Sequence, residues 1–265
     1  MKRGRDEVQH MTVFLVRHAA RFDFANKAEW RKTCERLGLE ASDPALSALG
    51  HAQARETAAA LAGEGVQHIL VSPYLRVIQT AQPLAHACNL PLCIEEGLAE
   101  LAYSPSAVPT ACARIAYFPE VDDQYAPMHP PVRAPQCVES NLDYLRRMLH
   151  VAASLSQRFP GSTVACFSHA ASVALVAALT RSETLDSIGT FAPCGIWKLV
   201  TDDGGRCWRV EKRGDDNSGH VSENAASTFP WGFRHSATTT AAKTSPAQWE
   251  ETWKEAVRLG PTASS

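Results

Sequence analysis

Short, continuous apolar runs along the chain predict strands that are buried on both faces. Each run has four or five residues, most contain β-branched side chains, and a run this short suits a strand better than a helix. The runs are Thr12–Val16, His68–Ser72, Pro91–Ile94 and Thr163–Phe167. Two later runs flank an Asp-Asp-Gly-Gly turn and predict a hairpin, Gly195–Val200 with Cys207–Lys212.

Between these strands, apolar residues recur at the three-to-four-residue spacing of amphipathic helices. The first such stretch, Ser47–Leu61, begins with a serine that can cap a helix, and Pro73 opens a second helix. The clearest pattern covers Leu142–Phe159, and Ala170–Leu179 is apolar enough for a buried helix. Strands that alternate with helices predict an α/β fold, here a three-layer α/β/α sandwich with a mostly parallel central sheet.

Two stretches depart from this alternation. Residues 101–140 hold seven of the sixteen prolines, and a long irregular segment of this kind often serves as a lid or binding loop; a plain surface insertion is the alternative. After about Asp215 the chain is rich in Ser, Thr and Ala, with scattered tryptophans and one helical stretch near Pro246–Val257. We expect an N-terminal extension (1–11), one domain (12–214) with an insertion (101–140), and a partly flexible C-terminal tail (215–265).

Composition and charge narrow the class of protein. The 265 residues are 45% hydrophobic and 20% charged, which allows a well-buried core. The net charge of -2 gives no basic excess, so neither a nucleic acid nor a membrane partner is indicated. The stretch Met1–His10 lacks the apolar core of a secretory signal, and no apolar run approaches the roughly 20 residues that span a bilayer. We expect a cytoplasmic protein; the sequence leaves a homodimer open.

Eight cysteines and ten histidines raise the question of a metal site or disulfides. The cysteines form no Cys-x-x-Cys pair, and no close pair is followed by histidines at zinc-finger spacing. Cys166 lies inside an apolar run, where a reduced thiol packs as a small hydrophobe. We therefore predict reduced thiols, no bound metal and no cofactor.

The residues that follow the predicted strands carry the candidate chemistry. In strand order they are Arg17 with His18, then Arg76, Glu100 and His169. The carboxyl ends of parallel strands meet at one edge of a sheet, which is where α/β proteins bind their ligands. Imidazole, guanidinium and carboxylate groups are therefore expected to converge on one rim.

This set of groups suits phosphoryl transfer that needs no metal. One guanidinium group can donate two hydrogen bonds to the oxygens of a phosphate, which makes Arg17, Arg21 and Arg76 candidate phosphate ligands. A neutral imidazole can attack phosphorus, so His18 is the candidate nucleophile, and a second imidazole, His169, can donate to the phosphoryl oxygens. Residues of these types taken alone more often have a structural or surface role, so the hypothesis depends on the combination.

The leaving oxygen of a phosphate ester needs a proton, which a carboxylic acid can supply. Glu100 is the candidate proton donor, with Glu95 and Glu96 as alternatives. Because His18 must be neutral and Glu100 protonated, the rate is expected to have a bell-shaped pH profile on the acidic-to-neutral side.

The combination resembles the histidine phosphatase superfamily, whose relatives include the phosphoglycerate mutases and acid phosphatases. The most specific match is SPYLRVIQTA (72–81), which reproduces the motif S-P-x-x-R-x-x-Q-T-A in full. The other matches follow the family order between about Thr12 and Val200: VFLVRHAARFD (13–23), DPALSALGHAQ (43–53), EGLAEL (96–101), Glu139-Ser140 and FSHAA (167–171). The resemblance implies a phosphoglycerate mutase-like fold, and it implies the same roles for His18, Glu100, His169, Arg17, Arg21 and Arg76.

Two alanines depart from the family pattern. Ala19 and Ala170 stand where the family usually has glycine, and a positive φ at Ala19 would strain the backbone by about 1 kcal/mol or more. Together with Arg21 and Asp43-Pro44, the second change resembles the branch of the T-cell ubiquitin ligand phosphatases and ecdysteroid phosphatase, which act on phosphotyrosine or steroid phosphate. The mutases typically carry Trp-Asn where this chain has Phe22-Asp23-Phe24, so a mutase is disfavoured.

The expected activity is that of a metal-independent phosphomonoesterase that works through a phosphohistidine on a phosphorylated small molecule or a phosphopeptide. Aromatic residues in the insertion favour an aryl or apolar leaving group, unless they only pack the loop: Tyr103, Tyr117, Phe118 and Tyr125. Two alternatives stay open. One is a catalytically weak phosphate-binding scaffold whose tryptophan-bearing tail recruits a partner, and the other is a sugar-phosphate mutase or bisphosphatase.

Overall fold

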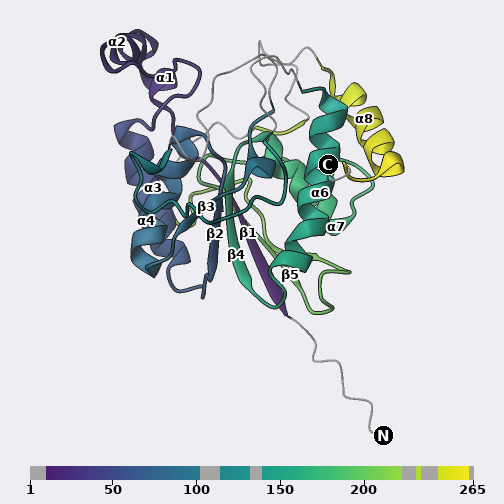
Figure 1. Cartoon of the computed structure of the whole chain (residues 1–265). Helices are drawn as coiled ribbons and strands as arrows, with labels where there is room; N and C mark the ends of the chain where they lie inside the picture. Colours follow the sequence, from purple (N-terminus) through teal and green to yellow (C-terminus); the bar gives the residue numbers. More distant parts are fainter. Residues whose placement is uncertain (1–9, 102–113, 132–138, 223–230, 234–243, 263–265) are drawn as a thin grey trace, which may run out of the picture.

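The computed structural model describes residues 10–101, 114–131, 139–222, 231–233 and 244–262, which contain a six-stranded sheet (Figure 1). The strand order is β3-β2-β4-β1-β5-β6. The strands are β1 Met11–Arg17, β2 His68–Val71, β3 Leu92–Ile94, β4 Thr163–Ser168, β5 Ile196–Thr201 and β6 Arg209–Lys212. Strands β1 to β4 are parallel, whereas β5 is antiparallel to β1 and to β6. Each predicted strand, and the predicted hairpin, is confirmed.

Alternate side chains of the central strands enter two separate cores, because successive residues of a strand point to opposite faces. Val13 and Leu15 of β1 lie in one core, and Phe14 and Val16 lie in the other. None of these four residues is more than 2% exposed. A sheet that is buried on both faces requires a layer of helices on each face.

Helices cover both faces and complete the three layers (Figure 1). One face is covered by α3 (Ala48–Leu61) and α4 (Leu75–Cys88). The other is covered by α6 (Asn141–Arg158), α7 (Ala174–Thr180) and α8 (Pro246–Leu259). Two single-turn helices, η1 (Glu96–Leu98) and η2 (Ala171–Val173), follow β3 and β4. The arrangement confirms the predicted α/β/α sandwich, although the second predicted helix begins two residues after Pro73.

The chain leaves the carboxyl edge of the sheet in opposite directions after β1 and β4. From β1 it continues toward α3 on one face, and from β4 it enters η2 and α7 on the other. The two strand ends are held side by side, because the backbone N–H of His18 donates to the carbonyl of Ser168 at 2.9 Å. In an open α/β sheet, such a divergence creates the crevice in which ligands bind.

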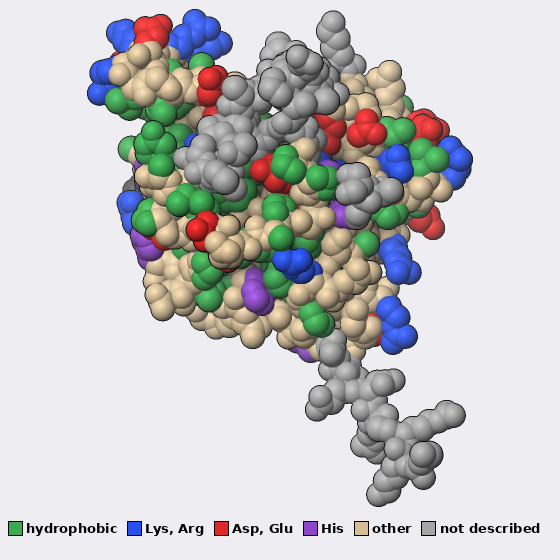
Figure 2. All heavy atoms as spheres, viewed as in Figure 1, with side chains coloured by type: hydrophobic (Ala, Val, Ile, Leu, Met, Phe, Trp, Pro, Cys, Tyr) green, Lys and Arg blue, Asp and Glu red, His purple; other side chains and the backbone are tan. Residues whose placement is uncertain are grey.

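Two helices that the sequence pattern did not predict follow β1: α1 (Phe22–Ala25) and α2 (Lys27–Leu37). The side chain of Asn26 caps α2 by accepting a hydrogen bond from the backbone of Glu29. Of the eleven residues of α2, four are Lys or Arg, and only Trp30 and Cys34 are buried, so its apolar periodicity is weak. We call α1 and α2 the α1–α2 lobe; it projects from the body of the molecule and carries charged side chains (Figure 2).

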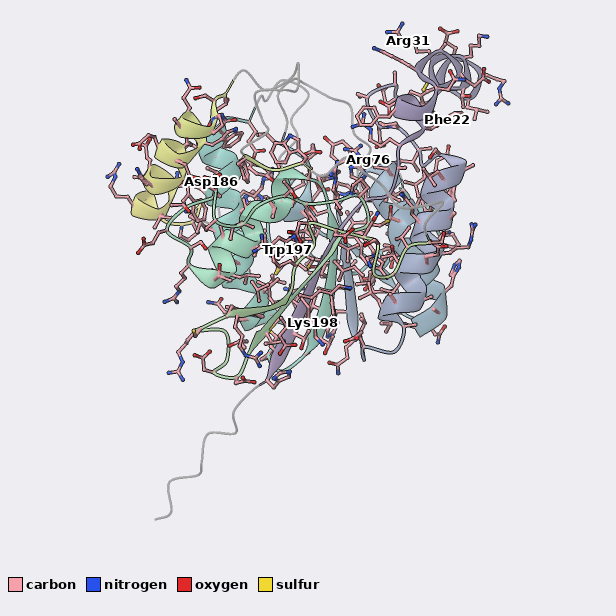
Figure 3. All side chains as sticks on the ribbon, turned by 180° about the vertical axis from the view of Figure 1, so that it is seen from behind. Phe22, Arg31, Arg76, Asp186, Trp197 and Lys198 are labelled. Atoms are coloured by element: carbon pink, nitrogen blue, oxygen red, sulfur yellow. The ribbon has the colours of Figure 1, made fainter. Side chains whose placement is uncertain are left out.

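Seen from behind, Arg76 lies at the end of the sheet nearest to this lobe, whereas Lys198 lies toward the opposite end (Figure 3). The lobe contributes Phe22 and Arg31 on that side of the molecule. The α1–α2 lobe therefore overhangs the same end of the sheet on which the predicted site residues converge.

Residues 114–131 of the predicted insertion lie alongside the edge strand β3. The backbone N–H of Leu92 donates to the carbonyl of Glu120 at 2.8 Å, which covers the open edge of the sheet. Phe118 is buried in the core beneath α4, and Tyr125 packs against the core on the other face. These two aromatic residues pack the loop onto the domain, which was the alternative to a role in substrate binding.

The described part of the predicted tail also packs on the domain. Helix α8 confirms the predicted helical stretch near residues 246–257, and Ser245, just before its first residue, caps it in a capping box with Gln248. Trp249 and Trp253 are 0% and 1% exposed and lie in the same core as α6. The carboxylate of Glu250 accepts hydrogen bonds from the backbone N–H groups of Leu185 and Asp186, which joins α8 to the loop after α7.

Six of the eight cysteines lie within the described residues, and all six are free thiols. Cys112, Cys137 and Tyr103 lie outside the described residues, as does most of the predicted N-terminal extension. Within the described ranges, no helix combines the length and the apolar character that crossing a membrane would require.

Candidate active site

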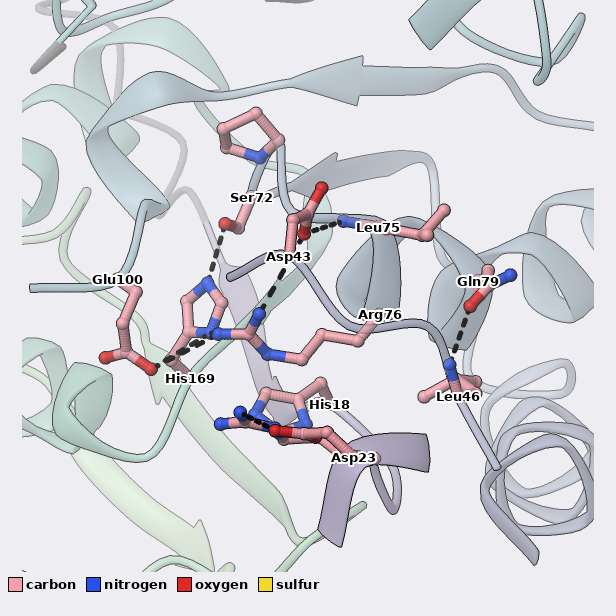
Figure 4. A network of polar contacts seen from close by, with 12 residues as sticks. His18, Asp23, Asp43, Leu46, Ser72, Leu75, Arg76, Gln79, Glu100 and His169 are labelled. Atoms are coloured by element: carbon pink, nitrogen blue, oxygen red, sulfur yellow. Dashed lines mark hydrogen bonds and ion pairs between the residues drawn. The ribbon is translucent and has the colours of Figure 1, made fainter. Parts of the chain in front are cut away.

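Residues from four strand ends meet at the carboxyl edge of the sheet (Figure 4). The imidazole rings of His18 and His169 have centroids 5.5 Å apart. Nη2 of Arg76 lies 3.0 Å from Nδ1 of His169, and Oε2 of Glu100 lies 3.2 Å from the same nitrogen. The structure therefore brings together the predicted nucleophile, second imidazole and proton donor with one of the predicted phosphate ligands.

The hydrogen bonding of His18 determines which of its nitrogens is available. Nδ1 lies 2.8 Å from the carbonyl oxygen of Ala19, and because a carbonyl only accepts, Nδ1 carries the proton. In the neutral ring, Nε2 therefore holds a free lone pair. Burial lowers the pKa of His18 well below its usual value, and the positive charge of Arg76 lowers it further. The ring is thus neutral at neutral pH, as a nucleophile must be.

His169 is completely buried, and other site residues surround its ring. Its Nε2 lies 2.7 Å from Oγ of Ser72, and the ring of Tyr74 packs edge-on at a centroid distance of 4.9 Å. Burial lowers the pKa of His169 to about 4, although the carboxylate of Glu100 opposes this shift. Neutral His169 accepts at Nδ1 from Arg76, whereas the protonated ring donates from Nδ1 to Glu100.

Arg76 has a buried side chain, 3% exposed, yet it keeps unused hydrogen-bond donors. Nε and Nη1 make no hydrogen bond with any described residue, and the acidic oxygen near Nη1 is Oδ1 of Asp43, 4.0 Å away. Burial lowers the pKa of Arg76, and the nearby charge of Arg21 adds to this effect. Buried donors without partners are costly, and the oxygens of a phosphate group are suited to satisfy them.

Of the three candidate proton donors, Glu100 is the best placed. Its Oε2 lies 3.6 Å from Nη2 of Arg76, and its side chain is 28% exposed. Burial raises the pKa of the Glu100 carboxyl, but the imidazole of His169 and the guanidinium of Arg76 outweigh it and lower the pKa to about 2. Glu95 is 0% exposed and accepts the backbone N–H of Met128, so it anchors the insertion, and Glu96 is buried in η1.

The other two predicted phosphate ligands flank the site. Nη1 of Arg17 donates to the carbonyl of Phe191 at 2.5 Å, and burial lowers the pKa of Arg17 to about 10. Arg21 donates from Nε and Nη2 to the two carboxylate oxygens of Asp23 at 2.9 and 2.7 Å. Its guanidinium lies 4.1 Å from the ring centroid of Phe24 in the α1–α2 lobe. Both arginines are therefore fixed by neighbouring groups.

Several residues of the matching motifs support the backbone that carries His18. The backbone N–H of Ala19 donates to Oγ1 of Thr80 at 3.1 Å, and that of Ala20 donates to Oε1 of Gln53 at 2.9 Å. Helix α3 approaches so closely that a Cβ on Gly50 would lie 2.2 Å from the carbonyl oxygen of Ala20. The motif glutamine, threonine and glycine thus position the loop that follows β1.

Sequence reasoning did not identify two buried residues next to Arg76. Asp43 is 3% exposed and accepts the backbone N–H of Leu75 at 2.9 Å, which fixes the start of α4 one residue before Arg76. Arg114 pairs with the other oxygen of Asp43 and donates from Nε to the carbonyl of Pro73 at 3.0 Å. Asp43 lies in a matching motif, but nothing in the sequence pattern marked Arg114.

The two alanines that replace family glycines are accommodated without backbone strain. The non-glycine residues with positive φ in the described ranges are Asn89, Arg181 and Cys194, so Ala19 is not among them. Ala170 has φ -60° and ψ -47°, an ordinary right-handed helical conformation. Neither methyl group therefore demands a conformation that an L-residue avoids.

The family model of the histidine phosphatase superfamily (branch 1) matches residues 13–216, which is most of the chain. The chain belongs to the histidine phosphatase superfamily. The match confirms the family and the phosphatase class that the motifs predicted. It covers all six candidate site residues, and it ends before α8.

Solved structures of phosphatases share the fold of this histidine phosphatase. An ecdysone phosphate phosphatase from Bombyx mori is 21% identical over 77% of this chain and 93% of that one, with a TM-score of 0.57. A mycobacterial glucosyl-3-phosphoglycerate phosphatase is 20% identical over 77% and 99% of the two chains, with a TM-score of 0.53. A phosphoserine phosphatase from Entamoeba histolytica is 18% identical over 80% and 99%, with a TM-score of 0.53. No curated protein matches the chain significantly in sequence.

Proposed function

We propose that this histidine phosphatase hydrolyses phosphomonoesters through a covalent phosphohistidine at His18, without a metal. The observation that carries the proposal is the hydrogen bond from Nδ1 of His18 to the carbonyl of Ala19, which leaves the Nε2 lone pair free. The unused, buried donors of Arg76 beside it supply a place for the phosphate that this nitrogen would attack.

In the first step, Nε2 of His18 forms a bond to phosphorus while the bond between phosphorus and the leaving oxygen breaks. The three arginines offset the charge on the non-bridging oxygens, which is the main contribution that a protein makes to phosphoryl transfer. A bound phosphate also favours the protonated form of His169, because the negative charge stabilises an imidazolium next to it. Nδ1 of His169 can then donate to a phosphoryl oxygen.

Glu100 supplies the proton that the leaving oxygen takes up. In the ligand-free site the pKa of Glu100 is lowered to about 2, by the positive groups around it. A phosphate dianion on the same arginines neutralises that charge and places a negative charge near the carboxylate, so substrate binding raises the pKa of Glu100. The requirement for this proton is greatest for alkyl leaving groups and smallest for phenols, which leave more readily as anions.

In the second step, a water molecule attacks the phosphohistidine. The carboxylate of Glu100, which has lost its proton, takes one from the water as the new P–O bond forms and the P–N bond breaks. Inorganic phosphate leaves, and both His18 and Glu100 return to their starting protonation states. The reaction therefore consumes only the ester and water.

We propose an aryl or apolar phosphate as the substrate, and Phe24 supports this choice. Phe24 is 77% exposed, and its ring stacks on the guanidinium of Arg21, one of the proposed phosphate ligands. An exposed ring beside a phosphate site offers an apolar surface to the leaving group. The shared fold with a phosphatase of ecdysone phosphate, a steroid ester, agrees with an apolar substrate.

The two alternatives have less support. The scaffold hypothesis depended on tryptophans in the tail that could recruit a partner, but Trp249 and Trp253 are buried in the core. The unstrained backbone at Ala19 also removes one reason to expect weak catalysis. A sugar-phosphate substrate agrees with the likeness to a glucosyl-3-phosphoglycerate phosphatase, and a screen of sugar phosphates against aryl phosphates distinguishes the two classes.

The test is turnover of 4-nitrophenyl phosphate by the wild type and by His18→Ala, each with and without a chelator. We expect turnover by the wild type, no effect of the chelator, and loss of turnover in His18→Ala. The matched control is His86→Ala, because the side chain of His86 is 61% exposed and pairs with Glu120 outside the site. Equal turnover by wild type and His18→Ala, or loss of wild-type turnover in chelator, contradicts the proposal.

A further inference from the structure

A buried ion pair that the proposed reaction does not use lies next to the segment that carries Glu100. Arg147 of α6 is 1% exposed, and Glu139, just before the same helix, is 9% exposed. Nε and Nη2 of Arg147 donate to the two carboxylate oxygens of Glu139 at 2.8 and 2.6 Å. Burial lowers the pKa of Arg147, but Glu139 outweighs burial and the pKa is raised, so the guanidinium stays charged.

The remaining nitrogen of this guanidinium holds the backbone that leads to Glu100. Nη1 of Arg147 donates to the carbonyls of Gly97 and Ala99 at 2.7 and 2.9 Å. Ala99 directly precedes Glu100, and it lies just past the end of the short helix η1. Because no strand or long helix fixes the backbone there, its carbonyl groups depend on side-chain donors.

The carbonyl of Leu98, between those of Gly97 and Ala99, accepts a hydrogen bond from a residue of β4. Oγ of Ser168 donates to the carbonyl of Leu98 at 2.7 Å, and Ser168 directly precedes His169. Helix α6 also packs closely on this segment, because a Cβ on Gly97 would lie 2.5 Å from the side chain of Val151. The three successive carbonyls before Glu100 are therefore held by Arg147 of α6 and by Ser168, the last residue of β4.

From this geometry we propose that Arg147, oriented by Glu139, is a positioning residue that holds Glu100 for proton transfer to the leaving group. The proposal rests on the function proposed above, and it deepens that function by assigning a residue outside the site. A buried ion pair is not by itself a favourable choice, because an apolar pair of similar size often packs as well. A guanidinium is required here because one side chain must bind a carboxylate with two donors and two carbonyls with a third nitrogen.

A displaced proton donor has a recognisable kinetic signature. General acid catalysis contributes about 10² to 10⁴-fold to the rate, and a misplacement of 1 Å costs on the order of 10²-fold. The loss falls on substrates whose leaving group needs the proton. A variant with a displaced Glu100 therefore has a low kcat/KM for an alkyl phosphate and a nearly normal kcat/KM for 4-nitrophenyl phosphate, whereas a variant that is only destabilised or partly unfolded loses both equally.

The experiment compares kcat/KM for ethyl phosphate with kcat/KM for 4-nitrophenyl phosphate in Glu100→Gln, Arg147→Lys and Glu139→Gln. This ratio reports the steps up to release of the alcohol, so it leaves out the hydrolysis of the phosphohistidine, in which Glu100 also acts and which both esters share. Lysine keeps the charge of Arg147 but cannot reach Glu139 and both carbonyls in the same geometry. We expect Glu100→Gln to lose about 10²-fold or more on ethyl phosphate and less than about threefold on the aryl ester. We expect the same selective loss, on the order of 10-fold or more, in Arg147→Lys and in Glu139→Gln.

Two further variants keep the result interpretable. The double variant Arg147→Met with Glu139→Leu removes both charges together, which preserves folding better than leaving one charge buried and unpaired, and it still removes the donors to Gly97 and Ala99. Arg146→Lys is the matched control, because Arg146 lies on the same helix but donates to the carbonyl of Gly260. We expect the selective loss in the double variant and no selective loss in the control.

The possible outcomes separate the two proposals. A selective loss in Glu100→Gln but equal losses on both esters, or no loss, in the Arg147 and double variants overturns the positioning role and leaves the proposed function standing. Equal losses on both esters in Glu100→Gln overturn the assignment of Glu100 as proton donor, and the positioning role falls with it. A selective loss in Arg146→Lys overturns the claim that the effect comes from Arg147.

Discussion

Two buried arginines use their hydrogen-bond donors in opposite ways. The side chain of Arg76 is 3% exposed and that of Arg147 is 1% exposed. Arg147 gives two hydrogen bonds to Glu139 and two to backbone carbonyls, and Glu139 raises its pKa. Arg76 has Nε and Nη1 without a hydrogen bond among the described residues, and burial lowers its pKa. A guanidinium whose donors are satisfied by its own chain stabilises a structure. A buried guanidinium that keeps unused hydrogen-bond donors can bind an anion.

The difference follows from where the two side chains lie. Arg147 is on the middle of α6 and faces a loop whose carbonyls need partners, so the fold itself supplies its acceptors. Arg76 lies in the first turn of α4 at the carboxyl edge of the sheet, where the chain diverges after β1 and β4. The comparison predicts that changes at Arg76 impair activity and that changes at Arg147 impair stability as well as proton transfer.

The largest expected effect is the loss of activity in Arg76→Met. Removing the donors that face the phosphate lowers kcat/KM for 4-nitrophenyl phosphate by on the order of 10³-fold. Stability changes by less than about 1 kcal/mol, because the removed charge had incomplete partners. Kinetics and urea unfolding on the same preparation check both parts. A variant that keeps its activity, or one that unfolds, would show that Arg76 is structural.

The next effect is on stability, in Arg147→Met. This change leaves Glu139 buried without its partner and lowers the free energy of unfolding by about 3–5 kcal/mol. The double variant Arg147→Met with Glu139→Leu recovers most of that loss, because it removes both charges. Urea unfolding monitored by circular dichroism measures each value. If the single variant is as stable as the wild type, the contrast between the two arginines is wrong.

The pKa of His18 provides a smaller effect that tests the electrostatics of the site. Burial and the charge of Arg76 lower it well below 6.5, so the ring stays neutral as the pH falls through 6.5 and becomes protonated only at a lower pH. An unshifted histidine at pH 5.5 would be only about a tenth neutral. An NMR titration of the ligand-free protein, with the signal assigned by His18→Gln, measures it. Protonation at or above pH 6.5 contradicts this account of the site.

The lowered pKa of His18 also predicts how the activity depends on pH. Activity falls as the pH drops through the lowered pKa of His18, and it falls again as the pH rises through the pKa of Glu100 in the substrate complex. The bell-shaped profile therefore extends further to the acidic side than an unshifted histidine would permit. An activity that rises steadily into alkaline pH is not compatible with these roles.

The smallest expected effect concerns the leaving group. In Phe24→Ala, KM for an aryl phosphate rises about 5- to 10-fold, because an apolar contact on the order of 1 kcal/mol is lost. KM for ethyl phosphate stays within about twofold. Val257→Ala is the control, since Val257 is an exposed apolar residue of α8, 53% exposed, that belongs to none of the candidate substrate-binding segments. Equal changes in KM for both substrates would remove Phe24 from the specificity site.

The sequence was sufficient to predict the sheet and the residues that converge at its carboxyl edge, because both depend on local patterns. A strand such as β1 is apolar along its whole length, and the residues that follow each parallel strand must share one edge. The pattern did not reveal α2, because a helix with two buried residues has little apolar periodicity. The convergence of His18, Arg76, Glu100 and His169 was predictable; the tautomer of His18 and the unused donors of Arg76 were not.

Residues that act through tertiary contacts also escaped prediction. Arg114 is important because it reaches Asp43, which is 71 residues away, and Arg147 because it reaches the carbonyls before Glu100. Neither contact has a local signature in the chain. Of the four aromatic residues that favoured an aryl leaving group, Phe118 is buried in one core and Tyr125 packs against the other. Tyr117 is 77% exposed, and Tyr103 lies outside the described residues. The sequence pattern did not point to Phe24, the exposed ring beside the proposed phosphate ligand Arg21.

The central claim is that His18 becomes phosphorylated, and trapping the intermediate tests it most directly. Wild type and His18→Ala are mixed with a phosphorus-labelled aryl phosphate and quenched within milliseconds in alkaline denaturant, and the labelled peptide is identified by mass spectrometry. The account predicts an acid-labile phosphoryl group on the peptide that contains His18 in the wild type and no label in His18→Ala. Rapid wild-type turnover without a labelled protein, or a label that persists in His18→Ala, would contradict it.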